Sequence, residues 1–130
     1  MTPDEHAFED LKKLRILVVE DEALILALIE DMLDEIGCTV AGSASTVQQA
    51  LQKSSGTDFD VAILDVNLGG TAVFPVAEAM RARGTPVIFT TGAGVESLPS
   101  SWQASPILKK PYQLADLVVG LRAVTDADLC

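Results

Sequence analysis

Short apolar runs that end in polar side chains recur along the chain. The runs cover residues 14–19, 61–64, 87–89 and 107–108, and the polar residues that follow them are Glu20, Asp21, Asp65, Thr90, Thr91, Lys109 and Lys110. Apolar runs of this length, bounded by turn residues, are typical of buried parallel strands. The pattern predicts strands over 14–20, 59–66 and 107–109, a strand that starts at residue 87, and a short strand over 39–42.

The segments between these strands mostly carry the apolar spacing of helices. Helices are predicted over 22–36, after a cap at Ser45 or Thr46, from Pro75 to about residue 83, and over 113–124. Residues 92–106 differ, because they contain two glycines, two prolines and four serines. They favour at most a short and weakly held helix, in which Trp102 either caps the core or anchors a partner.

Strands that alternate with helices predict an α/β domain. We expect a doubly wound, five-stranded parallel sheet with helices on both faces and right-handed crossovers. Residues 1–13 are polar and acidic and are expected to form a loose lead-in or one short helix. Residues 14–130 are expected to make a single domain, with no room for a second domain and no output domain behind it.

The composition excludes several classes of partner. The 130-residue chain is 48% hydrophobic, which excludes a disordered protein. Its formal charge of −10 disfavours nucleic acid and anionic membranes as partners. The alternative is that the charge only maintains solubility. Cys38 and Cys130 show no metal-ligand spacing, and we interpret Cys38 as a core residue. No signal region or membrane-length run is present, so a cytoplasmic location is expected.

The polar strand ends suggest a phosphoryl-transfer site. In an open parallel sheet, ligands bind at the carboxyl ends of the strands, so these side chains should share one crevice. Glu20, Asp21 and Asp65, with a backbone carbonyl just beyond Asp65, are a suitable ligand set for Mg²⁺. Thr91 would offer a hydroxyl and Lys110 a fixed positive charge to phosphoryl oxygens, with Asp65 as the acceptor.

This set of residues closely resembles the receiver domain of bacterial two-component response regulators over about residues 14–124. The resemblance implies a (βα)5, flavodoxin-like fold and a phosphoryl group taken from a histidine kinase. The implied roles are an acidic metal pair at Glu20 and Asp21, a phosphoacceptor at Asp65, a metal-binding backbone carbonyl at Asn67, a switch hydroxyl at Thr91 and the lysine before proline at Lys110. A receiver of this kind is not an enzyme with a separate substrate, although it catalyses its own phosphorylation and dephosphorylation.

One narrower resemblance and two departures from the family pattern concern how the domain passes on its signal. Phe89 to Gly92 resembles the Phe-Ala-Thr-Gly stretch of the FAT GUY receivers, with Thr90 in place of alanine. Ile107 stands where the family usually has an aromatic residue, and Gly69 stands where many receivers have proline. We expect a stand-alone receiver that signals through contact with a downstream protein or acts as a phosphate sink, with a switch in residues 92–106 reported by Trp102.

Single residues argue against other interpretations of the site. An aspartate-nucleophile phosphohydrolase usually has a second Asp where this chain has Asn67. A dinucleotide-binding loop at 92–94 would lie at the wrong strand, with Ser97 in place of the third glycine. A docking module with a vestigial pocket is disfavoured by the intact acids, Thr91 and Lys110. His6 is expected to be solvated.

Overall fold

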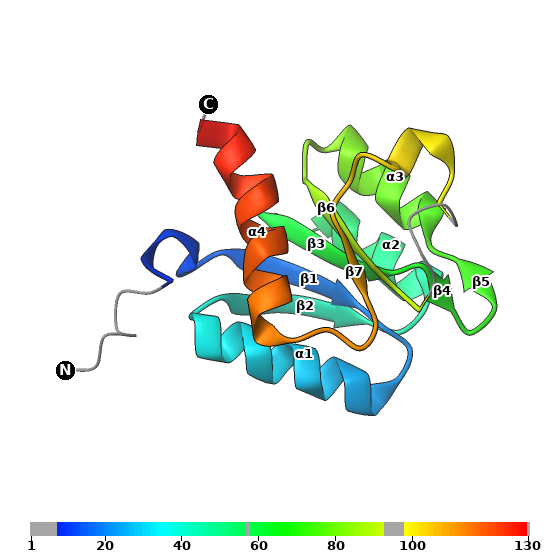
Figure 1. Ribbon diagram of the computed structural model, residues 1–130. Coiled ribbons are helices and arrows are strands. Elements are labelled where there is room, and N and C mark those ends of the chain that lie inside the picture. The colour runs from blue at the N-terminus through cyan, green and yellow to red at the C-terminus, as the bar shows by residue number, and fades with distance from the viewer. Residues whose placement is uncertain (1–7, 57, 93–97, 130) are drawn as a thin grey trace.

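Five parallel strands form one sheet (Figure 1). The computed structural model describes residues 8–56, 58–92 and 98–129, with side chains described up to residue 125. The strands are β1 (Arg15–Val19), β2 (Thr39–Ala44), β3 (Val61–Asp65), β6 (Val87–Thr91) and β7 (Ile107–Lys109). They lie in the order β2-β1-β3-β6-β7, and each neighbouring pair is parallel. This arrangement confirms the predicted doubly wound α/β fold.

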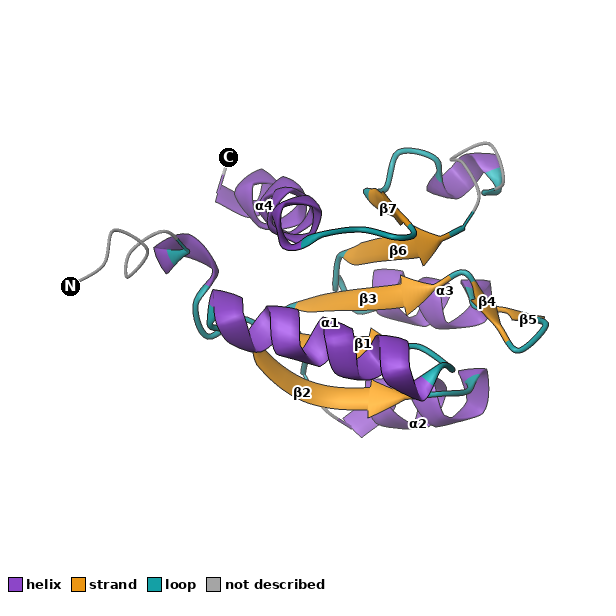
Figure 2. Ribbon diagram, turned by 60° about the horizontal axis from the view of Figure 1, so that its bottom comes forward, coloured by secondary structure: helices purple, strands orange, loops and turns teal. Residues whose placement is uncertain are grey.

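Helices cover both faces of the sheet (Figures 1 and 2). They are α1 (Ala23–Ile36), α2 (Val47–Gly56), α3 (Phe74–Ala82) and α4 (Leu114–Leu129). The helices α1 and α4 pack on one face, and α2 and α3 pack on the other. Gly37 ends α1 in the left-handed conformation, with a φ of 103°, and Thr46 Oγ1 accepts a hydrogen bond at the start of α2.

The alternation of side chains along the strands divides the core in two. In β1, Leu17 and Val19 join the cluster under α2 and α3, whereas Ile16 and Val18 join the cluster under α1 and α4. Every residue of β3 is buried, as expected of a strand covered on both faces. A central strand of this kind holds its last residue, Asp65, in a fixed position.

A small hairpin follows Asp65. Residues Asn67–Leu68 (β4) pair with Thr71–Ala72 (β5) in an antiparallel arrangement. Gly69 and Gly70 connect them with φ values of 56° and 92°, a conformation that residues with a side chain rarely adopt. The two glycines therefore shape the loop beside the predicted acceptor.

Between β6 and β7, the described residues contain only a short 3₁₀ helix, η4 (Ser100–Trp102). Trp102 is 4% exposed and packs edge-on against Phe89, with ring centroids 5.5 Å apart. Of the two roles considered for Trp102, the structure shows that it covers the core. Residues 93–97 of the predicted switch segment lie outside the described residues.

The described residues before residue 14 pack against the rest of the domain. Glu9–Leu11 form a 3₁₀ helix, η2, and the side chain of Leu11 is fully buried. The Cys38 thiol donates a hydrogen bond to the Leu11 carbonyl at 3.4 Å, and Arg122 of α4 pairs with Asp10. The described end of the expected lead-in is therefore part of the packed unit, and residues 1–7, with His6, lie outside the described residues.

Candidate functional site

The predicted site residues lie at the carboxyl ends of four neighbouring strands. Glu20 follows β1, Asp65 ends β3, Thr91 ends β6, and Lys110 follows β7. Since the strands are parallel and adjacent, residues far apart in the sequence meet at this edge of the sheet. The neighbouring pairs are in register here, with Asp65 beside Thr90 on the next strand.

Three carboxylates come together in this crevice. One ligand oxygen from each of Glu20, Asp21 and Asp65 lies within 4.8 Å of the other two. Glu20 and Asp65 are 1% and 6% exposed, whereas Asp21 is exposed. Clustered carboxylate oxygens repel one another and are the ligands that Mg²⁺ prefers, so the donor set fits this cation.

Lys110 bridges the two buried acids. Its Nζ lies 3.2 Å from Oε1 of Glu20 and 3.0 Å from Oδ2 of Asp65. Its main chain is also fixed, because the Lys110 N–H donates to the Thr91 carbonyl at 2.7 Å. Partial burial lowers the pKa of Lys110, but the hydrogen bond to Asp65 and the charges of Asp65 and Glu20 outweigh this and raise it. The site therefore holds a permanent positive charge directly at the acceptor.

Main-chain donors hold the carboxylates in place. The Glu22 N–H donates to Oε2 of Glu20 at 3.2 Å, and the Asn67 N–H donates to Oδ1 of Asp65 at 3.2 Å. The Asn67 side chain has a different task, since its Oδ1 accepts a hydrogen bond from the Gly70 N–H at 2.8 Å. Asn67 thus orients Asp65 through its backbone and closes the hairpin turn through its side chain.

A cavity of about 440 Å³ opens above Asp65. Its wall consists of Asp21, Glu22, Asp65, Asn67, Gly69, Gly70, Thr91, Gly92 and Lys110. All predicted site residues except the more deeply buried Glu20 therefore face one space. The sequence does not predict Glu22, Gly69, Gly70 or Gly92 as site residues. The signal that points to Gly69 and Gly70 is the Gly-Gly pair in the loop after the acceptor strand.

Glu20 carries the strongest electrostatic perturbation among the acids. Burial raises the pKa of Glu20 to about 7, the Glu22 N–H opposes this, and the negative charge of Asp65 adds to it. Near neutral pH this site therefore exchanges a proton readily. A divalent cation would replace that proton, because it stabilises the ionised form of all three acids.

Several residues with reactive groups lie away from the cavity wall. Lys109 is exposed, whereas its neighbour Leu108 on the same strand is buried. Burial raises the pKa of the Cys38 thiol to about 11, so it is an inert core group, as predicted. Cys130 lies outside the described residues.

None of the described helices has both the length and the apolar character needed to cross a membrane.

The comparisons with known proteins agree with this geometry. Residues 16–122 match the family model of the response regulator receiver domain. The transcriptional regulatory protein TcrA of Mycobacterium tuberculosis is 36% identical over 118 residues, which cover 85% of this chain and 46% of TcrA. The chain thus spans about half the length of the curated relatives it matches.

Solved structures with the same fold cover most of the chain. SdrG from Sphingomonas melonis is 41% identical with a TM-score of 0.77, over 88% of this chain and 96% of SdrG. A structure of the BeF3-activated conformation of SdrG gives 40% identity and a TM-score of 0.76, over 88% and 98% of the two chains. The receiver domain of the sensor histidine kinase PA1611 from Pseudomonas aeruginosa holds a magnesium ion in its active site cleft. It shares the fold at 24% identity and a TM-score of 0.68, over 85% and 96% of the chains.

Proposed function

The chain belongs to the response regulator receiver domain family, and from that premise we propose that it accepts a phosphoryl group from a histidine kinase on Asp65 with the help of Mg²⁺. The observation that carries this proposal is the contact between Lys110 and Asp65 inside a cluster of three carboxylates. An acceptor oxygen, a fixed cation and a set of metal ligands are the groups that phosphoryl transfer requires.

In the proposed reaction, an oxygen of Asp65 forms a bond to the phosphorus atom. The bond from phosphorus to the donor histidine nitrogen breaks, and its electron pair stays on the imidazole. Glu20, Asp21, Asp65 and the Asn67 carbonyl would hold Mg²⁺, which would supply positive charge to offset that of the phosphoryl group. The Lys110 ammonium and the Thr91 hydroxyl donate to phosphoryl oxygens as Asp65 loses its negative charge.

The surface beside the cavity supports a protein as the phosphoryl donor. Leu24 and Leu28 of α1 are 74% and 52% exposed, which is unusual for large apolar side chains lying close together on one helix. Next to them lies a predominantly apolar groove of about 350 Å³, lined by Ile25, Leu28, Ile29, Met32, Lys110, Pro111 and Tyr112. Since Lys110 borders both this groove and the phosphoryl cavity, a kinase bound here would present its phosphohistidine to Asp65.

The downstream role is part of the same proposal. The phosphorylated domain would act through contact with a second protein or draw phosphoryl groups away from a competing pathway. We propose a stand-alone receiver of the FAT GUY subgroup, and Phe89, Thr91 and Gly92 support the subgroup. We propose that this activity takes place in the cytoplasm, where ATP supplies the phosphoryl groups of histidine kinases. Beyond its own phosphorylation and dephosphorylation, we propose no enzymatic activity.

A small phosphodonor tests the proposal without a partner. The protein is incubated with acetyl phosphate and Mg²⁺, and intact-protein mass spectrometry counts the phosphoryl groups attached. The parent and Asp34→Asn, a matched change of an exposed acid on α1, should gain one group, whereas Asp65→Asn should gain none. Stoichiometric labelling of Asp65→Asn would refute the assignment. Sustained release of phosphate from a generic aryl phosphate would instead support a phosphohydrolase.

A further inference from the structure

An aromatic contact connects the two chain segments that leave the phosphoryl cavity. On one side, the hairpin after Asp65 leads into α3, whose first residue is Phe74. On the other side, β6 ends at Thr91, and Phe89 lies two residues earlier on the same face of the strand. The Phe74 and Phe89 rings are in contact, with centroids 5.7 Å apart and an interplanar angle of 56°. Because Phe89 is fully buried, a displacement of either segment acts on its ring.

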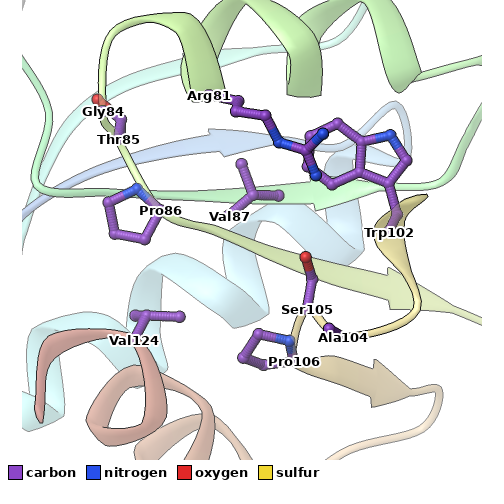
Figure 3. Close-up of a pocket in the computed structure, with 10 residues that line it drawn as sticks. All are labelled: Arg81, Gly84, Thr85, Pro86, Val87, Trp102, Ala104, Ser105, Pro106 and Val124. Atoms are coloured by element: carbon purple, nitrogen blue, oxygen red, sulfur yellow. The ribbon is translucent and has the colours of Figure 1, made fainter. Parts of the chain in front are cut away.

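Trp102 extends this contact to η4. Its indole meets the Phe89 ring edge-on at 80°, with centroids 5.5 Å apart. The guanidinium of Arg81 on α3 lies over the Trp102 ring, 3.5 Å from the ring centre (Figure 3). Arg81 Nη2 also donates a hydrogen bond to the Ser101 carbonyl at 3.0 Å. One arginine of α3 therefore holds both the ring and the main chain of η4.

Free space lies directly beside this contact. A cavity of about 370 Å³ is bordered by Arg81 and Trp102 and by residues at the amino-terminal ends of β6 and β7 (Figure 3). Val87, Pro106 and Val124 give this cavity an apolar wall. Because protein interiors are close-packed, a large ring can change its position only toward free space. This open cavity therefore offers the indole an alternative position.

The neighbouring strand, β7, has no aromatic residue that could pack against Phe89 in this way. Ile107 of β7 is the register partner of Phe89 and packs against the same core cluster. It occupies the position where the resemblance to receivers leads one to expect an aromatic residue three places before Lys110. On this face of β6, the described aromatic contacts come from Phe74 and Trp102.

We propose that Trp102, clamped by Arg81 against Phe89, is the switch residue of this domain. The proposal rests on the phosphorylation of Asp65 described above. In the unphosphorylated protein the indole is stacked under Arg81. When a phosphoryl group draws in Thr91 and the hairpin, the Phe74–Phe89 contact shifts and Trp102 moves away from Arg81 toward the adjacent cavity. A phosphoryl group can shift this balance because its contacts differ between the two arrangements.

Fluorescence of Trp102 tests the switch, since it is the only tryptophan in the chain. Saturating Mg²⁺ and beryllofluoride, a phosphoryl mimic, are added while fluorine NMR records occupancy of the Asp65 site independently. The parent should show a clear change in emission, and Asp65→Asn should show neither bound fluoride nor a change. Arg81→Gln and Arg81→Lys should bind the mimic but lose at least half of the change, because neither side chain reproduces the planar stack.

Arg83→Gln is the matched control. Arg83 lies at the same end of α3 but pairs with Asp58 at 3.0 Å, so its loss should leave the emission change as in the parent. Bound mimic without an emission change in the parent would overturn the switch and leave the proposed function intact. A parent-like change in both Arg81 variants would overturn the clamp. Absence of any bound mimic in the parent would overturn the proposed function and the switch with it.

Discussion

Magnesium binding should depend steeply on pH between 6 and 8, because Glu20 must lose its proton to act as a ligand. Its pKa of about 7 means that the metal-free site is mostly protonated at pH 6 and mostly ionised at pH 8. For one competing proton, the apparent Kd for Mg²⁺ should be about tenfold weaker at pH 6 than at pH 8. Each ion bound should also release a large fraction of a proton at pH 6 and little at pH 8.

The same shift affects the stability of the metal-free protein, with a sign opposite to that of most paired acids. The folded state binds the Glu20 proton more tightly than the unfolded state, whose carboxyl has the ordinary pKa of 4.5. The stability that the protonated Glu20 contributes to the folded state is therefore complete below pH 4.5 and is lost as the pH rises to about 7. The loss corresponds to about 3 kcal/mol, and saturating Mg²⁺ should abolish it.

Titration calorimetry in two buffers of different ionisation enthalpy measures both the Kd and the protons released. Glu20→Gln should bind Mg²⁺ weakly and with little pH dependence. Glu35→Gln, which changes an exposed acid on α1, should behave like the parent. A parent Kd that stays constant from pH 6 to pH 8, with no proton release at pH 6, would refute the assignment of Glu20.

Three further changes test the packing and the site. Leu11→Ala should lower the free energy of unfolding by about 2–5 kcal/mol in denaturant titrations, whereas Leu28→Ala, on the exposed face of α1, should change it little. Thr90→Val should raise it by about 1 kcal/mol, because the buried Thr90 hydroxyl has no hydrogen-bond partner among the described residues. Thr85→Val is the opposite control, since that hydroxyl donates to the Phe59 carbonyl and its loss should destabilise. Lys110→Ala should retain Mg²⁺ binding but lose the beryllofluoride-induced emission change, while Lys109→Ala keeps both.

The site could be predicted from the sequence largely because the strands could be. Apolar runs fixed the strand ends, and parallel pairing then required Glu20, Asp65, Thr91 and Lys110 to meet. Spacing alone could not reveal that Lys110 already pairs with both buried acids in the unphosphorylated protein. That contact joins Lys110 to residues that lie 45 and 90 positions away in the sequence, and it depends on the conformation of the lysine side chain.

Other features gave too little signal in the sequence. The strands β4 and β5 have two residues each, which is too short for any periodicity to appear. Leu11 is a single apolar residue among charged neighbours, and its burial depends on contacts with distant elements such as Cys38. The sequence allows two roles for Trp102, because a ring in a segment without periodicity can face the core or the solvent. The packing against Phe89 decided its position.

Phosphotransfer from a histidine kinase to Asp65 is the central claim, and mapping the acceptor residue tests it most directly. Purified histidine kinases from the source organism would be autophosphorylated and mixed with the parent protein and Mg²⁺, and the modified peptide identified by mass spectrometry. The account predicts that at least one kinase transfers its phosphoryl group and that the label lies on Asp65, with none taken up by Asp65→Asn. Transfer to any other residue, or no transfer from any of the kinases, would contradict it.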